Sequence, residues 1–145
     1  MKLKRNYIFF GLFGLFLIIQ LIPVDRENPP SSSEMELKAP IEVNTILKNS
    51  CYDCHSNQTN WPFYSYIAPI SWLVAYDVKN AREHLNFSEW NNLTSEKKNR
   101  NKEEIIEETS ADKMPLPIYL IIHSRAELND EQKLILKNWA ETTGE

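Results

Sequence analysis

The 145-residue sequence has few cysteines and histidines: it contains two cysteines and three histidines. A structural zinc site needs four ligands. The two histidines outside the cysteine motif, His84 and His123, lack the paired spacing of a zinc finger. No Val/Ile-rich alternating run flanks the cysteines, so the βαβ pattern of a thioredoxin-like redox motif is missing too. A zinc finger is thereby excluded, and a thiol oxidoreductase without a cofactor is the weakest interpretation.

The chain also lacks internal repeats and an excess of positive charge. Its formal net charge is -4. Setting Lys2, Lys4 and Arg5 aside from the 16 basic residues leaves 13 against 20 acidic ones, a charge of -7. An acidic domain argues against nucleic acid as a partner. It fits electrostatic docking to a basic patch on a redox partner protein.

Both cysteines lie in the stretch CYDCH, residues 51 to 55. Two thiols at this spacing can add across the two vinyl groups of one haem, and the adjacent histidine then ligates the iron, which is the c-type attachment pattern. A Cys51–Cys54 disulfide is the competing use of two close thiols in an exported protein. Because His55 follows directly, the motif predicts one covalent haem c held by both cysteines, with His55 as the proximal iron ligand.

The N-terminus combines three basic residues with an apolar run from Tyr7 to Val24. A signal peptide ends in a small-residue cleavage site, which is missing here, and the run is near the minimum for a bilayer span. We therefore expect residues 1–24 to be an uncleaved single-pass anchor in a bacterial inner membrane, with the haem domain in the periplasm. The Pro- and Ser-rich residues 25–39 predict a flexible linker, and residues 40–145 form the haem-binding domain.

Hydrophobic periodicity predicts that this domain is all-α. Pro40 can open a first helix whose apolar face leads to Cys51. Residues 69–85 show a helical pattern that is apolar on two sides, which predicts a helix sandwiched between other parts of the protein. Residues 94–109 form a mostly charged surface helix. In the last helix Asn129 and Gln132 can form a capping box.

The sixth iron ligand has three candidates, which are Met114, His84 and His123. Met114 is the only methionine within the predicted domain, and it lies in a proline-rich loop, ADKMPLP, before the last helix. An isolated methionine often only fills a core. Met/His coordination is nevertheless a standard way to raise the potential of an electron carrier, so we expect Met114 to be the distal ligand.

Residues 40 to 141 resemble the small, membrane-anchored bacterial haem-binding domain family related to cytochrome c. The stretches that carry the resemblance are CYDCHSN, WPFYSYIAPISWLVAYDV, LNFSEW, KMP and HSRAELNDEQ. The resemblance implies a cytochrome c-like helical fold around one haem. It also implies that Cys51 and Cys54 carry the haem, with His55 as proximal and Met114 as distal ligand.

Two classes of function follow from these patterns. The first is a tethered monohaem cytochrome that passes single electrons to a redox partner protein. The second is a haem-based sensor or peroxidase-like enzyme with a labile distal ligand, which would need an acid/base residue on the distal side. Nothing in the sequence places His84 or His123 there, so electron transfer is the favoured interpretation.

Overall fold

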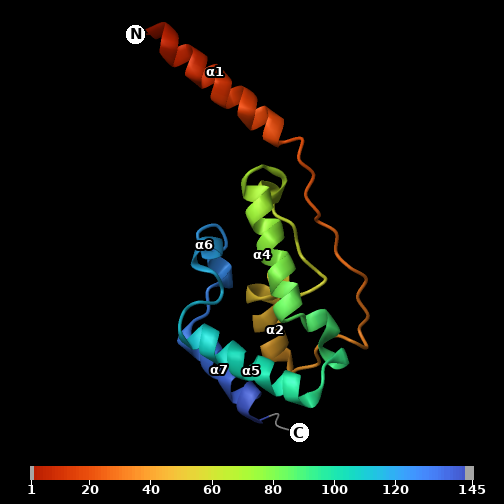
Figure 1. Ribbon diagram of the computed structural model, residues 1–145. Coiled ribbons are helices and arrows are strands. Elements are labelled where there is room, and N and C mark those ends of the chain that lie inside the picture. The colour runs from red at the N-terminus through yellow and green to blue at the C-terminus, as the bar shows by residue number, and fades with distance from the viewer. Residues whose placement is uncertain (1, 143–145) are drawn as a thin grey trace.

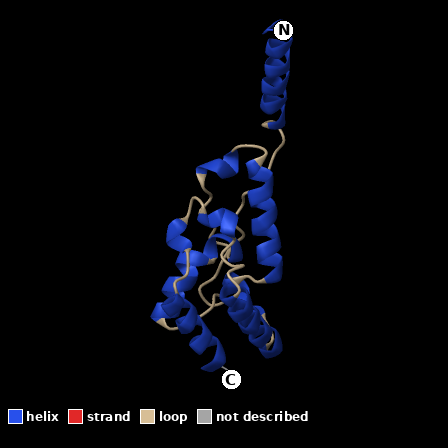
Figure 2. Ribbon diagram, turned by 90° about the vertical axis from the view of Figure 1, so that its left-hand side faces the viewer, coloured by secondary structure: helices blue, strands red, loops and turns tan. Residues whose placement is uncertain are grey.

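The computed structural model describes residues 2–142, with side chains from Asn6 onward, and every regular element in this range is helical (Figures 1 and 2). The α-helices are α1 (Lys2–Ile19), α2 (Ile41–Ser50), α3 (Tyr52–His55), α4 (Ile70–His84), α5 (Ser95–Ser110), α6 (Pro117–Leu120) and α7 (Asp130–Thr142). Three short 3-10 helices are η1 (Phe63–Tyr66), η2 (Phe87–Asn92) and η3 (Ser124–Ala126). The prediction of an all-α chain is confirmed.

The predicted transmembrane anchor is wrong. Helix α1 ends at Ile19, well before Val24, and no helix among residues 2–142 is long and apolar enough to cross a membrane. A helix rises about 1.5 Å per residue and a bilayer core is about 30 Å thick, so 18 residues that begin with basic ones fall short. Pro23 prevents the helix from continuing through the rest of the apolar run. The expected inner-membrane location, which rested on this anchor, is corrected with it.

Helices α2 and α7 follow the sequence pattern closely. Pro40 precedes α2, and the predicted face of that helix is buried. The N–H of Gln132 donates to Asn129 Oδ1 at 2.9 Å, and the N–H of Asn129 donates to Gln132 Oε1 at 3.0 Å, which confirms the capping box of α7. Trp139 is buried where α7 packs on α5 and α2. Helices α2 and α7 therefore pack against each other in the domain.

The core forms where α2, α5 and α7 meet the loop that follows α4 (Figure 1). Its aromatic centre is Phe87, only 1% exposed, whose ring stacks on Tyr52 with centroids 5.3 Å apart and lies 6.2 Å from the ring of Trp90. The other members are Leu37, Val43, Ile46, Leu47, Leu85, Ile105, Leu128, Leu136 and Trp139. Tyr52 and Leu85 belong to this core and also adjoin the cysteine motif, so the core directly supports the site.

Helix α4 extends from this core and is covered on one side only. Val78 is buried, whereas Trp72 and Tyr76 on the outer face are exposed, Tyr76 by 63%. The apolar second side of the helix is thus exposed at Trp72 and Tyr76, unlike the sandwiched arrangement that the sequence suggested. The inner side faces α3 and η1, and this side builds one wall of the site.

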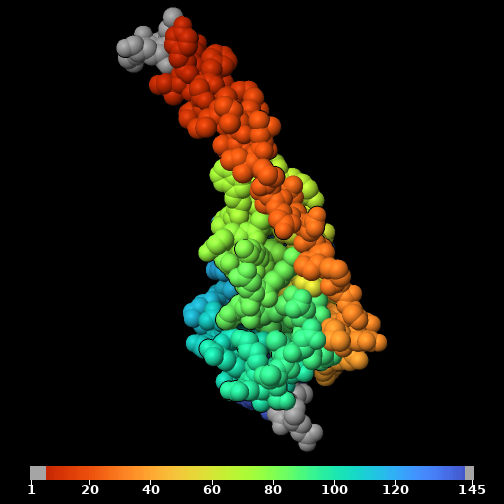
Figure 3. Space-filling view, turned by 45° about the vertical axis from the view of Figure 1, so that its right-hand side comes forward, coloured from red at the N-terminus to blue at the C-terminus, as the bar shows by residue number. Residues whose placement is uncertain are grey.

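Residues 25–39, for which the composition predicts a linker, run along the surface of the domain (Figure 3). The N–H of Leu37 donates to the carbonyl of Phe87 at 2.9 Å, and the N–H of Asn91 donates to the carbonyl of Met35 at the same distance. Leu37 is buried in the core. The segment is therefore hydrogen-bonded to the loop after α4 before it enters α2.

Candidate functional site

The cysteine motif forms a single helical turn at the end of α2. Cys51 lies between α2 and α3, and Cys54 lies inside α3. Both thiols are free and half-buried. Burial, together with the charge of Cys54, raises the pKa of Cys51 to about 12. Burial and the charges of Asp53 and Asp77 raise the pKa of Cys54 to about 11. Both sulfurs are thus held protonated against an apolar wall.

His55 is oriented by the end of helix α4. Its Nδ1 lies 3.0 Å from the backbone carbonyl of Leu85, and because a carbonyl only accepts, Nδ1 carries the proton. Burial lowers the pKa of His55, so the imidazole is neutral and Nε2 keeps its lone pair. A histidine that donates its other ring N–H to a carbonyl is the usual arrangement of a metal ligand. The edge of the ring also lies against Phe87, with centroids 6.3 Å apart.

Three adjoining cavities lie against this turn. The first, about 290 Å³, touches both cysteines and His55. The second, about 270 Å³, shares Cys54 with it and extends between the inner side of α4 and α6. The third, about 180 Å³, shares Cys51 and His55 with it and extends toward α5. Their linings are largely apolar, so the two thiols and the imidazole border three neighbouring, largely apolar cavities.

Met114 lines the first and third cavities, as His55 does. Its loop is held by α5, because the N–H groups of Lys113 and Met114 both donate to the carbonyl of Glu108, at 3.0 and 3.1 Å. The Met114 side chain is half-buried. The structure therefore brings the predicted thioether and the predicted imidazole to the walls of the same space.

The two alternative ligands are placed differently. His84 lines the same two cavities, but its side chain is 64% exposed and its Nε2 pairs with Glu104 at 2.9 Å. His123 lines a separate cavity of about 250 Å³ together with Arg125, and it does not line the three cavities at the cysteines. Its Nε2 lies 2.8 Å from the hydroxyl of Tyr64. Both histidines thus have Nε2 engaged by another side chain.

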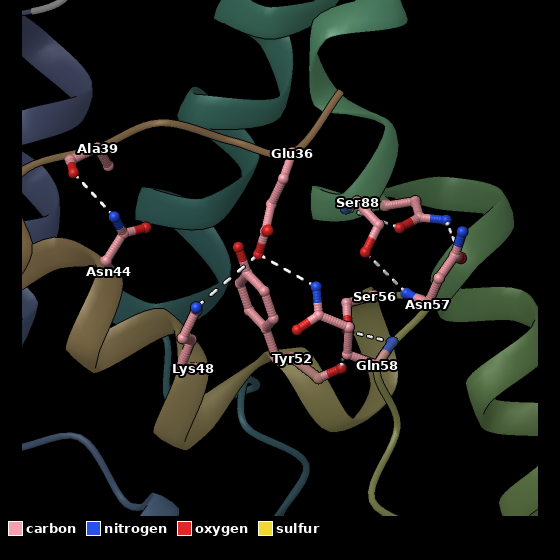
Figure 4. A network of polar contacts seen from close by, with 10 residues as sticks. Glu36, Ala39, Asn44, Lys48, Tyr52, Ser56, Asn57, Gln58 and Ser88 are labelled. Carbon is pink, nitrogen blue, oxygen red and sulfur yellow. Dashed lines mark hydrogen bonds and ion pairs between the residues drawn. The ribbon is translucent and has the colours of Figure 1, made fainter. Parts of the chain in front are cut away.

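Sequence reasoning missed the group that seats His55. The stretch LNFSEW, residues 85–90, supplies the Leu85 carbonyl and also holds the backbone after His55. The N–H of Asn57 donates to Ser88 Oγ at 3.0 Å (Figure 4), and Asn86 Nδ2 donates to Asn57 Oδ1 at 2.8 Å. The signal was present as one of the stretches that carry the family resemblance, but the sequence did not show that it meets CYDCHSN in space.

The same close-up shows how the other side of the motif is held (Figure 4). The carboxylate of Glu36 lies beside the Tyr52 ring, where it accepts a hydrogen bond from Gln58 Nε2 at 3.3 Å and lies 4.0 Å from Lys48 Nζ. Burial and this carboxylate raise the pKa of Tyr52. Residues on both sides of CYDCH are therefore fixed by side chains from distant segments.

These donors fit a haem. Two thiols three positions apart and a neutral imidazole whose Nε2 keeps its lone pair border largely apolar cavities, as the binding of a large apolar macrocycle requires. The sequence pattern of the haem-binding domain family matches residues 14–142. The chain belongs to this family. It is a haem-binding protein, and the match covers the segment before α2 as well as the helical domain. Comparisons with curated proteins and with solved structures found no match.

Proposed function

We propose that this haem-binding protein is a monohaem c-type cytochrome that carries single electrons. Cys51 and Cys54 would hold the haem through two thioether bonds, His55 Nε2 would be the proximal ligand and Met114 Sδ the distal one. The cytochrome c-like arrangement is part of this proposal. When bound, the haem supplies a one-electron iron couple whose potential the axial ligands and the surrounding polarity set.

The observation that carries the proposal is the hydrogen bond from His55 Nδ1 to the carbonyl of Leu85. It leaves Nε2 as the only unprotonated ring nitrogen, in a residue that borders the same space as the two thiols. A structural histidine in an apolar core has both nitrogens satisfied by protein groups. Here Nδ1 is held by the Leu85 carbonyl, and Nε2 keeps the lone pair that a metal needs.

An electron carrier is supported over a sensor or peroxidase by the groups around the same cavities. His84 has a largely exposed side chain paired with Glu104, and His123 lies outside the three cavities at the cysteines, which argues against either imidazole as a distal acid or base. Met114, by contrast, lines both cavities that His55 lines. A thioether ligand favours the ferrous state and raises the potential. The partner would be another redox protein, which the acidic charge of the chain would draw to a basic patch.

Covalent attachment is tested with the full chain made in a host that matures c-type cytochromes. After extraction with acidified acetone the protein should keep its colour, and its intact mass should show one haem. Cys51→Ala and Cys54→Ala should each retain at most one thioether, and His55→Ala should lose normal attachment. Lys79→Ala, an exposed position on α4, is the control and should match the wild type. Haem that passes entirely into the acetone would refute c-type attachment and leave only non-covalent haem binding.

A further inference from the structure

Arg82, on the side of α4 that faces the cysteine motif, joins three separate segments of the chain. Its Nε donates to the carbonyl of Ser56 at 2.8 Å, and its Nη2 donates to Thr59 Oγ1 at 2.7 Å. The same Nη2 donates to Asn28 Oδ1 at 2.7 Å, and Nη1 donates to the carbonyl of Glu27 at 3.1 Å. Only the planar, five-donor guanidinium can hold partners in so many directions.

These contacts bear directly on His55. Ser56 is the next residue, so Arg82 holds the backbone on one side of the histidine. Three residues further along the same helix end, Leu85 accepts the hydrogen bond from the imidazole. At the end of α4, the Leu85 carbonyl therefore holds the imidazole ring of His55. Arg82, one helical turn earlier, holds the backbone that follows His55. Leu85 directly follows α4, and its N–H donates to the carbonyl of Ala81 at 2.8 Å, so the two contacts are coupled through the end of the helix.

The segment before α2 completes this arrangement. Asn28 accepts from Arg82 and also donates from Nδ2 to the carbonyl of Thr59 at 2.9 Å. Two residues later the carbonyl of Pro30 accepts from Asn57 Nδ2 at 3.2 Å. Residues 27–30 thus lie over the guanidinium and over the loop that follows His55, and they restrict the rotamers that Arg82 can adopt.

We propose that Arg82 is a positioning residue for the iron-ligating histidine, and that residues 27–30 act with it as part of the haem site. The inference rests on the proposed function, because it assigns a role in holding His55 as an axial ligand. It adds to that function a region that lies before the predicted haem domain. A loosened Ser56 carbonyl would let the backbone of His55 move and weaken the hydrogen bond from Nδ1 to Leu85.

The test uses the full chain with its covalent haem. In the oxidised protein the proton on His55 Nδ1 is shifted by the iron, so its exchange with solvent can be followed by NMR. Arg82→Lys keeps the charge but loses the planar fork. Since hydrogen bonds to charged groups are among the stronger ones, we expect this exchange to become about tenfold faster, or about 1.4 kcal/mol. Asn28→Ala should change it in the same direction by a smaller factor, with Lys79→Ala as the control.

An internal reference separates positioning from general destabilisation. The backbone N–H of Leu136, which is fully buried in α7, should exchange at the wild-type rate in each variant that affects His55. Equal acceleration at Leu136 and His55 would show a merely structural role and overturn the inference, as would unchanged exchange at His55. If Arg82→Lys fails to fold, Asn28→Ala decides the outcome by the same comparison. A wild type whose haem passes entirely into acidified acetone would refute the proposed function itself, and that extraction distinguishes the two failures.

Discussion

Replacing Phe87 by alanine should be among the most damaging single changes to this protein. The ring is 1% exposed and contacts three aromatic rings, stacking on Tyr52 and lying near Trp90 and His55. A Phe→Ala change in a packed core costs about 3–5 kcal/mol, and aromatic pairs add to the loss beyond their buried area. We expect a loss of about 4 kcal/mol in the free energy of unfolding, a large part of the stability of an ordinary domain.

Urea unfolding of the haem-loaded chain, followed by far-ultraviolet circular dichroism, measures this loss. The midpoint should fall with little change in slope, and the melting temperature should fall by more than about 10 °C. Phe63→Ala is the matched control, because Phe63 is 74% exposed and surface changes stay within about 0.5 kcal/mol. A loss below about 1 kcal/mol for Phe87→Ala, or an equal loss in the control, would refute the description of Phe87 as the centre of the core.

Three further predictions concern the site and one helix end. Met114→Ala should remove the weak charge-transfer band of sulfur–iron ligation from the ferric spectrum and lower the potential, because the thioether favours ferrous iron; His84→Ala should leave both unchanged, and the reverse result would assign the distal site to histidine. Asn129→Ala, which removes the cap of α7, should cost about 1 kcal/mol in urea unfolding, and no loss would contradict the capping role. In chain made without haem, burial raises the pKa of Cys51 to about 12 and that of Cys54 to about 11, so both thiols stay protonated near neutral pH. Near pH 8 iodoacetamide should therefore react more slowly with the folded chain than with the urea-unfolded chain. Its reaction with the folded chain should speed up as the pH rises above about 10. Equal rates for the two chains near pH 8 would show that the thiols are exposed.

The parts of the fold that sequence reasoning predicted are those that local interactions decide. The capping box of Asn129 and Gln132 joins residues three apart, and the buried face of α2 follows from helical spacing alone. CYDCH likewise signals its chemistry within five residues. Each of these signals can be read without knowing what lies next to it in space.

What the sequence did not reveal depends on contacts between distant segments. The ring of His55 is held by the carbonyl of Leu85, which is 30 residues away in the sequence. Arg82 is held by Asn28, which precedes it by 54 residues. No periodicity or spacing rule connects such positions. The end of α1 was missed for a different reason, because hydropathy alone extended the apolar run beyond the last helical residue, Ile19. The electrostatic and geometric character of the site therefore had to come from the structure.

A final prediction concerns Asn101, which is fully buried in α5. Neither Nδ2 nor Oδ1 of this residue has a hydrogen-bond partner among the described residues. An unsatisfied buried polar group costs about 1–3 kcal/mol, and leucine also favours a helix over asparagine by roughly 0.5 kcal/mol. Asn101→Leu keeps the branched shape of the side chain, although its larger methyl groups offset part of the gain. It should therefore stabilise the haem-loaded protein by about 1 kcal/mol in urea unfolding. Asn99→Leu, at an exposed position on the same helix, should show only the smaller contribution from helix propensity. If Asn101→Leu instead destabilises the protein while Asn99→Leu does not, the gain from removing the two polar atoms is smaller than the cost of the larger side chain, and the prediction is wrong.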